Sequence, residues 1–441
     1  MNRYLGELKL IAEAKTGFPK GITKITDRVY FMLGYGGSTA TLIEGQESCV
    51  LIDTLNGREA AEEALAELRQ FTAKPIKTII FTHYHHFDHT AGAGVFAAGG
   101  CEIIARTPLY PQYTRSELLK DIAAIRGARQ FGVGLTPGEI ISMGIGPMNE
   151  LNSTKAILKP TRWFSEDRLT LNLDGIEVHL VGAPGETDDQ LFVWLPQFKV
   201  LCSGDNYYHS WPNLYAIRGG QYRDISQWVS SLDAMLAYDA EHLLPGHTRV
   251  ISGKEAVREN LTNYRDAIQY ILEETLKGMN KGMTIAQLVD TVKLPEKWAV
   301  LPNLQEYYGT VAWTVRSIYT GYLGWFDGNP TKLGSLPVRI KAEKTLAIMG
   351  GAEKVYATAK QAIEHEDEQW GVELCDILLD AGEKVAESKA LKAEGLLHLG
   401  RMQVSANARH YYLACAKELL GQSGPAKLAG AAMDMAKRNE G

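Results

Sequence analysis

The stretch Thr82-His83-Tyr84-His85-His86-Phe87-Asp88-His89 decides how this chain is interpreted. It follows a β-branched run at 76–81, typical of a buried strand, and precedes a helix predicted over 90–98. Four of the chain's 11 histidines fall within seven positions here, together with a carboxylate. Imidazole and carboxylate suit zinc and similar ions. The early histidines can face one ion, and Asp88 and His89 a second. A polar loop that happens to be His-rich is the alternative, and it explains the clustering less well.

Composition indicates a globular protein with more than one domain. The chain has 441 residues, of which 45% are hydrophobic and 22% charged. The net charge of −6 argues against general attraction to nucleic acid or an anionic membrane. We find no apolar run long enough for a transmembrane helix and no signal-peptide pattern at the start. The five scattered cysteines indicate free thiols, so we expect a cytoplasmic protein.

The chain divides near residue 254 into two parts with different sequence patterns. Residues 1–254 alternate short apolar runs with Ala-, Glu- and Leu-rich stretches, which predicts alternating strands and helices of an α/β domain. Within it, the irregular stretch 106–160 is rich in glycine and proline, and we expect it to roof a pocket. Residues 255–441 lack strand signals and predict an all-α domain of antiparallel helix pairs.

Three further ligand candidates follow later predicted strands. Glu186 lies in a turn after one strand, Asp205 after the next, and His247 after the last. One sheet edge can gather all three, although each turn taken alone can be only a turn. Two cations about 3.5–4 Å apart can activate water between them, and a bridging carboxylate would fix their separation. Asp53 ends an earlier strand and could support a ligand from behind; a plain turn carboxylate is the alternative.

The His-rich stretch resembles the His-x-His-x-Asp-His signature of the metallo-β-lactamase superfamily. It contains one extra residue, so either His85 is the second ligand in a bulged loop or His86 takes its place; we favour His85. The resemblance implies an αββα sandwich followed by the all-α domain, and two divalent metal ions, with Zn²⁺ expected. The implied ligands are His83, His85 and Glu186 for one ion, Asp88, His89 and His247 for the other, and Asp205 as the bridge.

The runs 213–224, 306–310 and 321–330, with Glu186 where the superfamily usually has histidine, resemble the alkylsulfatases of this superfamily. That resemblance implies hydrolysis of alkyl sulfates to alcohol and sulfate by a hydroxide held between the two metals. It also implies a homodimer formed through the helical domain at 255–441. Two features depart from the family: we expect its C-terminal lipid-carrier-like domain to be missing, and Asp205 stands where the family has glutamate.

Candidate substrate-binding and catalytic residues follow Asp205. Arg218 and Arg223 precede a helix predicted to start at Asp224, and a guanidinium binds anionic oxygens in pairs, as a sulfate ester would require. Solvated surface arginines are the alternative. Tyr207, Tyr208 and His209 could protonate a leaving oxygen or simply line the pocket. Of these, Tyr207 and His209 are the candidate catalytic residues, together with Asp88.

Two other functions remain open from the sequence. One is another hydrolase on the same scaffold, such as a lactonase or a phosphodiesterase, because one fold hosts many chemistries. The other is a non-catalytic scaffold protein whose helical domain binds partners. A scaffold should not need two metal ions per chain, so metal content separates these possibilities.

Overall fold

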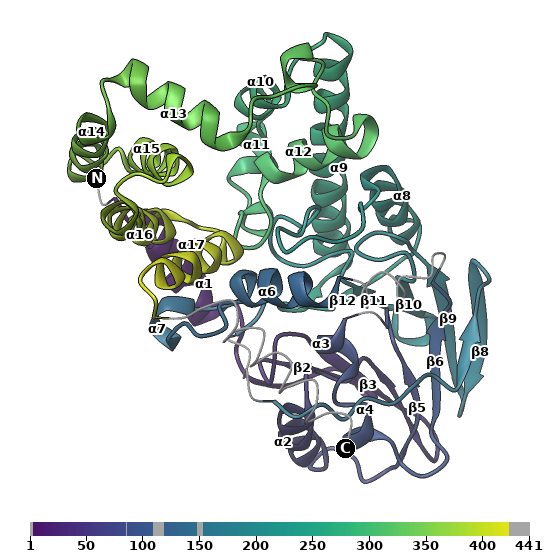
Figure 1. The fold of residues 1–441 in the computed structure, drawn as a ribbon. Helices are drawn as coiled ribbons and strands as arrows, with labels where there is room; N and C mark the ends of the chain where they lie inside the picture. The colour runs from purple at the N-terminus through teal and green to yellow at the C-terminus, as the bar shows by residue number, and fades with distance from the viewer. Residues whose placement is uncertain (1–2, 85, 109–118, 148–152, 423–441) are drawn as a thin grey trace.

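The computed structural model describes residues 3–84, 86–108, 119–147 and 153–422. Its centre is a pair of stacked sheets, which lie in the lower half of Figure 1 with the helices from α9 onwards above them. The first sheet has the order β1 to β7, with antiparallel neighbours up to β4 and parallel neighbours after it. Its strands are β1 (Gly21–Thr26), β2 (Val29–Leu33), β3 (Ala40–Glu44), β4 (Cys49–Ile52), β5 (Ile76–Ile80), β6 (Glu102–Arg106) and β7 (Arg162–Phe164).

The second sheet has the order β13-β12-β11-β10-β9-β8. Its neighbours are antiparallel except for β11 and β12, which run parallel, so their carboxyl ends point the same way. Its strands are β8 (Arg168–Leu173), β9 (Ile176–Gly182), β10 (Leu191–Leu195), β11 (Val200–Gly204), β12 (His242–Pro245) and β13 (Ile251–Ser252).

Strand β2 shows how the layers form. Successive side chains of a strand point to opposite faces. Val29, Phe31 and Leu33 enter the core between the two sheets. Tyr30 and Met32 enter a second core, under the helices on the outer side of the first sheet. Both faces of β2 are therefore buried, as the predicted αββα sandwich requires, and the fold class is confirmed.

Helices cover both outer faces of this sandwich. Helices α2 and α4 pack against the first sheet, whereas α8 and α9 pack against the second. Asp224 caps α8 as predicted, because its side chain accepts hydrogen bonds from the backbone of Ser226 and Gln227. Among the described residues up to 280, the helices are α1 (Leu5–Thr16), α2 (Arg58–Leu68), α3 (Phe87–Thr90), α4 (Ala93–Phe96), α6 (Lys120–Gln130), α7 (Pro137–Ile140), α8 (Ile225–Leu236) and α9 (Lys254–Asn280).

The helix predicted over 90–98 is instead two short helices, and the first of them starts earlier. Helix α3 begins at Phe87, so Asp88 and His89 lie in its first turn. The interruption comes at Gly92, where a Cβ atom would lie 2.0 Å from the carbonyl oxygen of Thr54. Only glycine fits at this position, because the chain passes so close to the backbone after β4.

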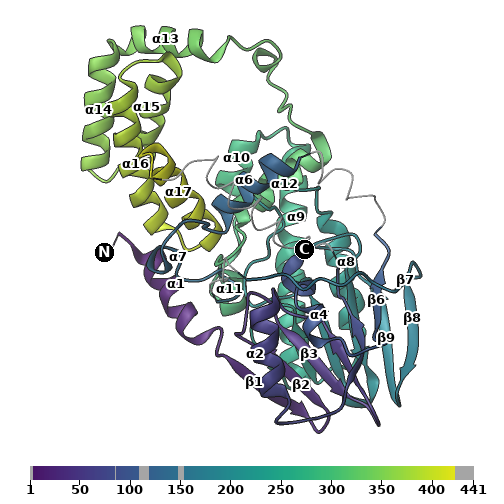
Figure 2. The ribbon, with the colours of Figure 1, turned by 60° about the horizontal axis from the view of Figure 1, so that its bottom comes forward.

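The C-terminal helices stack in antiparallel pairs, as predicted. Figure 2 shows α13 and α14 at the end farthest from the strands, joined to α12 by an extended segment. No helix among the described residues has the length and apolar character needed to span a membrane. The remaining helices are α10 (Ile285–Thr291), α11 (Glu296–Ala299), α12 (Val311–Leu323), α13 (Val338–Met349), α14 (Ala352–Glu364), α15 (Glu368–Ala381), α16 (Val385–Met402) and α17 (Ala406–Leu419).

The expected boundary at residue 254 coincides with the start of α9 but does not divide the core. Leu261 and Ile268 of α9 belong to the same hydrophobic cluster as Phe192 and Leu201 of the second sheet. The division into 1–254 and 255–441 therefore stays a prediction.

The insertion at 106–160 is more regular than its composition predicts. Within its described part, α6 and α7 form and both pack against α17. Its residues 109–118 and 148–152 lie outside the described residues.

Candidate metal centre

The carboxyl ends of three strands bring most of the predicted ligands together. His83 follows β5, Asp205 follows β11 directly, and His247 follows β12. Asp88 and His89 come from α3, which starts a few residues after His83. This edge of the two sheets therefore collects imidazole and carboxylate groups from segments far apart in the sequence.

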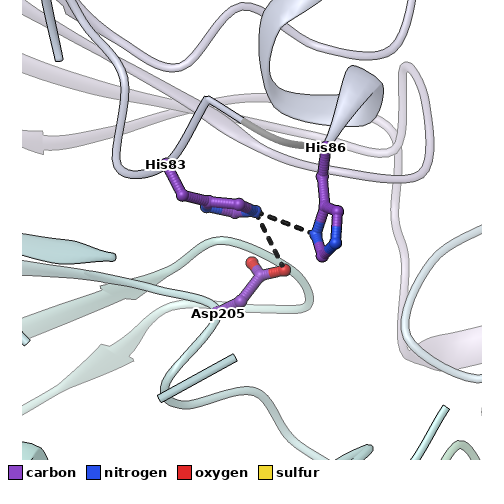
Figure 3. A group of neighbouring side chains, drawn as sticks. All are labelled: His83, His86 and Asp205. Atoms are coloured by element: carbon purple, nitrogen blue, oxygen red, sulfur yellow. Dashed lines mark hydrogen bonds and ion pairs between the residues drawn. The ribbon is translucent and has the colours of Figure 1, made fainter. Parts of the chain in front are cut away.

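His83, His86 and Asp205 form the first group of candidate ligands. One ligand atom from each lies within 4.8 Å of the other two. The Nε2 atom of His83 is 3.1 Å from Nδ1 of His86 and 3.8 Å from Oδ2 of Asp205. Figure 3 shows the three side chains converging from two loops. His86, the alternative second ligand, is thus placed in the group, whereas His85 lies outside the described residues.

Asp88, His89 and His247 form the second group, again with ligand atoms within 4.8 Å of one another. The Nε2 atoms of His89 and His247 are 3.4 Å apart, and Nε2 of His247 is 3.4 Å from Oδ2 of Asp88. His89 and His247 are buried. Two ring nitrogens and a carboxylate oxygen that face one another in this way suit a cation.

Asp205 contacts histidines of both groups. Its Oδ1 lies 3.2 Å from Nε2 of His89, and its Oδ2 lies 3.3 Å from Nε2 of His247. Burial alone would raise the pKa of Asp205, but His89, His247 and His83 hold it well below its usual range. The carboxylate is therefore charged and placed where a bridging ligand would be needed.

Three carboxylates around the buried His89, those of Asp53, Asp88 and Asp205, indicate that this donor set fits a cation. Burial alone would lower the pKa of His89, but Asp205, Asp88 and Asp53 raise it well above its ordinary value. The carboxylates thus favour a positive charge in this buried position. A divalent metal ion supplies positive charge without a proton, so the residues present match the metal that the resemblance implies.

Asp53 fixes the orientation of the His89 ring through Nδ1, the ring nitrogen that does not face the other ligands. Its Oδ2 is 2.9 Å from Nδ1 of His89 and accepts a hydrogen bond from the Thr82 hydroxyl at 2.7 Å, while its Oδ1 accepts one from the Thr82 backbone at 2.8 Å. Asp53 adopts a left-handed backbone conformation, with φ of 56°, which aspartate in a turn tolerates. A proton held on Nδ1 leaves Nε2 of His89 free to bind a metal.

Glu186 and Arg223 form a buried ion pair beside the first group. Oε1 of Glu186 lies 2.6 Å from Nη1 of Arg223, which also donates to the carbonyl oxygen of Asn213. Burial raises the pKa of Glu186. The positive charge of Arg223 lowers this pKa, and the negative charge of Asp205 raises it further. Arg223, a predicted substrate-binding residue, thus forms its ion pair with Glu186, a predicted metal ligand.

Arg218, the other predicted substrate-binding residue, reaches the first group itself. Its Nη2 atom lies 3.5 Å from Nε2 of His86. Its guanidinium carbon lies 5.6 Å from the centre of the Phe131 ring. The structure therefore places a guanidinium directly beside the candidate metal ligands.

The three residues after Asn206 point in different directions. Tyr207 lies in the core with α9, where its hydroxyl is 3.2 Å from Oδ1 of Asn260, so it is not brought to either group. The His209 ring nitrogens are buried, and neither has a hydrogen-bond partner among the described residues. Burial, with Arg249 nearby, lowers the pKa of His209 to about 3. Tyr208 alone lies against a ligand, with its ring 5.9 Å from that of His247.

Two residues near the site were quoted from the sequence only as parts of longer runs. Tyr308 precedes α12 and is buried, with its ring 5.8 Å from that of Tyr208. Burial raises the pKa of Tyr308 most, Glu186 and Asp88 raise it further, and Arg218 lowers it. The Tyr308 hydroxyl is therefore close enough to interact electrostatically with all three. Asn213 is buried, and its side-chain amide has no hydrogen-bond partner among the described residues. Their only sequence signal is membership of the runs 306–310 and 213–224.

Two protein-family models match separate parts of this chain. A model described as the metallo-beta-lactamase superfamily matches residues 33–247. A model described as alkyl sulfatase dimerisation matches residues 284–422. The helical part therefore has a family match of its own, and the residues between the two matches, 248–283, include all of α9.

Curated relatives match most of this chain. A linear primary-alkylsulfatase of Pseudomonas is 37% identical over 90% of this chain and 76% of the relative. The alkyl/aryl-sulfatase BDS1 of Saccharomyces cerevisiae is 32% identical over 90% of this chain and 64% of its own length. The solved stereoselective inverting sec-alkylsulfatase Pisa1 from Pseudomonas is 29% identical, with a TM-score of 0.86 over 93% of this chain and 67% of that one. The chain thus spans about three quarters of the first relative and less than two thirds of the second.

Proposed function

The chain belongs to the alkylsulfatase family of the metallo-β-lactamase superfamily, and from this premise we propose that it hydrolyses sulfate esters to an alcohol and inorganic sulfate. Relatives at 30 to 37% identity over 90% of the chain are named as alkylsulfatases, or as an alkyl/aryl-sulfatase. One observation of the structure carries the proposal to this site: the Arg218 guanidinium lies beside His86, where a sulfate group would meet both the arginine and the metal ligands.

We propose that two divalent ions, Zn²⁺ by preference, bind here. His83 and His86 would hold one ion and Asp88, His89 and His247 the other, with Asp205 shared between them. Glu186 would join the first ion, oriented by Arg223. Such a pair of ions, when bound, supplies positive charge to the reacting group and lowers the pKa of water.

The chain's own residues would orient the ester. Arg218 would hold anionic sulfate oxygens, because its planar guanidinium donates in pairs and remains charged. Tyr308 offers a hydroxyl in the same region, and Asn213 an amide that has no partner within the described part of the chain. Asp53 keeps the His89 ring in one orientation through its bond to Nδ1. Together these residues would fix the sulfate head of the substrate and leave the alcohol part unspecified.

A panel of substrates tests the proposal. Purified metal-loaded protein is assayed on alkyl sulfates of several lengths, an aryl sulfate, a lactone, a phosphodiester and a β-lactam. We expect a sulfate ester to have the highest kcat/KM. Hydrolysis of the lactone or the phosphodiester without any sulfate ester would overturn the assignment and favour the other hydrolase functions.

We also propose that the chain is a homodimer in the cytoplasm. The match to an alkyl sulfatase dimerisation model supports the first part, and free cysteines support the second. The segment from the end of α12 to α13 exposes an unusual number of large apolar side chains, and such patches mark interfaces. They are Tyr322, Leu323, Trp325, Leu333, Leu336, Val338, Ile340 and Ile348.

A further inference from the structure

Helix α6 packs against helix α17 (Figure 1) and also contacts the loop that carries Arg218. Two of its side chains bind that loop. The side-chain oxygen of Gln130 accepts a hydrogen bond from the Arg218 backbone at 2.9 Å. Arg126 donates through Nη2 to the carbonyl oxygen of Ile217 at 2.5 Å. The end of α6 therefore fixes the backbone at the residue whose guanidinium reaches the metal ligands.

Helix α17 holds the same end of α6 from the other side. The ring of His410 lies between two carbonyl oxygens, with Nδ1 3.1 Å from that of Gln130 and Nε2 3.0 Å from that of Ile140. One residue earlier in α6, Arg129 makes two hydrogen bonds to the carboxylate of Glu418, at 2.8 and 2.7 Å. Gln130 is thus bound through its backbone to α17 and through its side chain to the Arg218 loop.

The stability of the fold alone does not explain why a glutamine amide is buried at position 130. The residue is fully buried, and among the described residues its Nε2 has no hydrogen-bond partner. The amide oxygen has to face Arg218, because the backbone N–H there is a donor. A buried N–H without a partner is unfavourable, so methionine would fill this position without that cost. The oxygen bonded to Arg218 is the feature that methionine cannot supply.

We propose that Gln130 is a positioning residue for the sulfate site, whose amide oxygen fixes the Arg218 backbone so that the guanidinium stays beside His86. This inference rests on the proposed function of Arg218 as the sulfate-binding group. Without the bond, the loop can move relative to α6, and the guanidinium is no longer held at the position where it meets the substrate. Binding and orientation of the anion then suffer, although Gln130 touches no substrate atom.

The test is Gln130→Met in the full, metal-loaded chain, assayed on the best sulfate ester. Loss of one hydrogen bond should lower kcat/KM about three- to tenfold, mainly through KM, with metal content unchanged and Tm nearly so. In an Arg218→Ala background the same substitution should change kcat/KM less than about twofold, because residues that act through each other are not additive. Packing damage would instead lower activity by the same factor in both backgrounds.

Lys120→Met is the control on the same helix. Lys120 is exposed at the start of α6, at the opposite end from Gln130, so we expect less than about a twofold change. An unchanged kcat/KM for Gln130→Met, equal factors in the two backgrounds, or an equal effect of Lys120→Met would overturn the inference. A parent chain that hydrolyses no sulfate ester would refute the proposed function instead, so the two failures are distinguishable.

Discussion

The Oδ1 atom of Asp205 lies 3.2 Å from Nε2 of His89, while its Oδ2 faces His83 of the other ligand group at 3.8 Å. One carboxylate of the first ligand group therefore also contacts the second. This connection makes the two clusters a single centre, because loss of Asp205 would leave the buried histidines of both clusters without the negative charge that they share.

The first prediction concerns metal content. Zinc-loaded, desalted protein should contain about two ions per chain, and Asp205→Ala should contain one or none, because the shared ligand is lost. Elemental analysis measures both. Asp167→Ala is the control, since Asp167 is a fully exposed carboxylate whose nearest ion-pair contact, to Arg106, is long at 3.9 Å. A wild-type chain that binds one ion or none after loading would contradict the centre.

The second prediction concerns the register of the His-rich stretch. Because His86 lies 3.1 Å from His83 within the first group, His86→Ala should lose metal from the first site. His85→Ala should retain it. Metal titration of both variants, side by side, measures the difference. The opposite result would restore the pair His83 and His85 that the sequence favours.

Much of this architecture could be predicted because its signals are local. A buried strand followed by clustered histidines specifies a site at the end of that strand, and Asp205 and His247 stand in the same relation to β11 and β12. The register at His85 and His86 could not be decided, because one extra residue can be absorbed by a loop in two ways.

Other features depend on contacts between distant segments. Helix α6 was not foreseen, because Gly127 lowers its helical propensity and bonds to α17 help to hold it. The partner of Arg223 was not foreseen either, since Glu186 lies 37 positions away and meets it only in the folded site. Tyr207 shows the converse: its neighbours along the chain lie near the centre, but its own side chain points into the core.

The third prediction concerns assembly. Ile348 and Val338 are 88% and 64% exposed in the apolar segment after α12. If this segment is the dimer interface, Ile348→Asp together with Val338→Asp should convert a dimer to a monomer, because buried carboxylates are costly. Light scattering at micromolar concentration measures the mass. Val300→Asp is the control, since Val300 is 65% exposed outside the segment. A monomeric parent would contradict the proposal.

The fourth prediction concerns pH and the N-terminal helix. Hydrogen bonds from Arg401 and Arg409 lower the pKa of Glu7 and tie α1 to α16 and α17. A carboxylate whose pKa is lower in the folded state adds stability above its unfolded pKa, and that stability is lost as pH falls through the folded value. Glu7→Gln should therefore lower Tm by about 1–2 °C at pH 7, and the difference should shrink as pH falls below the ordinary glutamate pKa of 4.5 and Glu7 takes up a proton. Glu62→Gln, an exposed carboxylate of α2, should show no such trend.

The fifth prediction separates the two arginines by what they contact. Arg218 lies beside His86 and should bind substrate, so Arg218→Ala should lower kcat/KM for a sulfate ester roughly 10- to 100-fold with metal content unchanged. Lysine should restore only part of this, because a point charge cannot replace a planar fork. Arg223 pairs with Glu186, so Arg223→Ala should instead weaken metal binding, as the unpaired, buried Glu186 then favours its protonated form. Parallel kinetics and metal titration test the contrast, and equal effects of the two substitutions on metal affinity would contradict it.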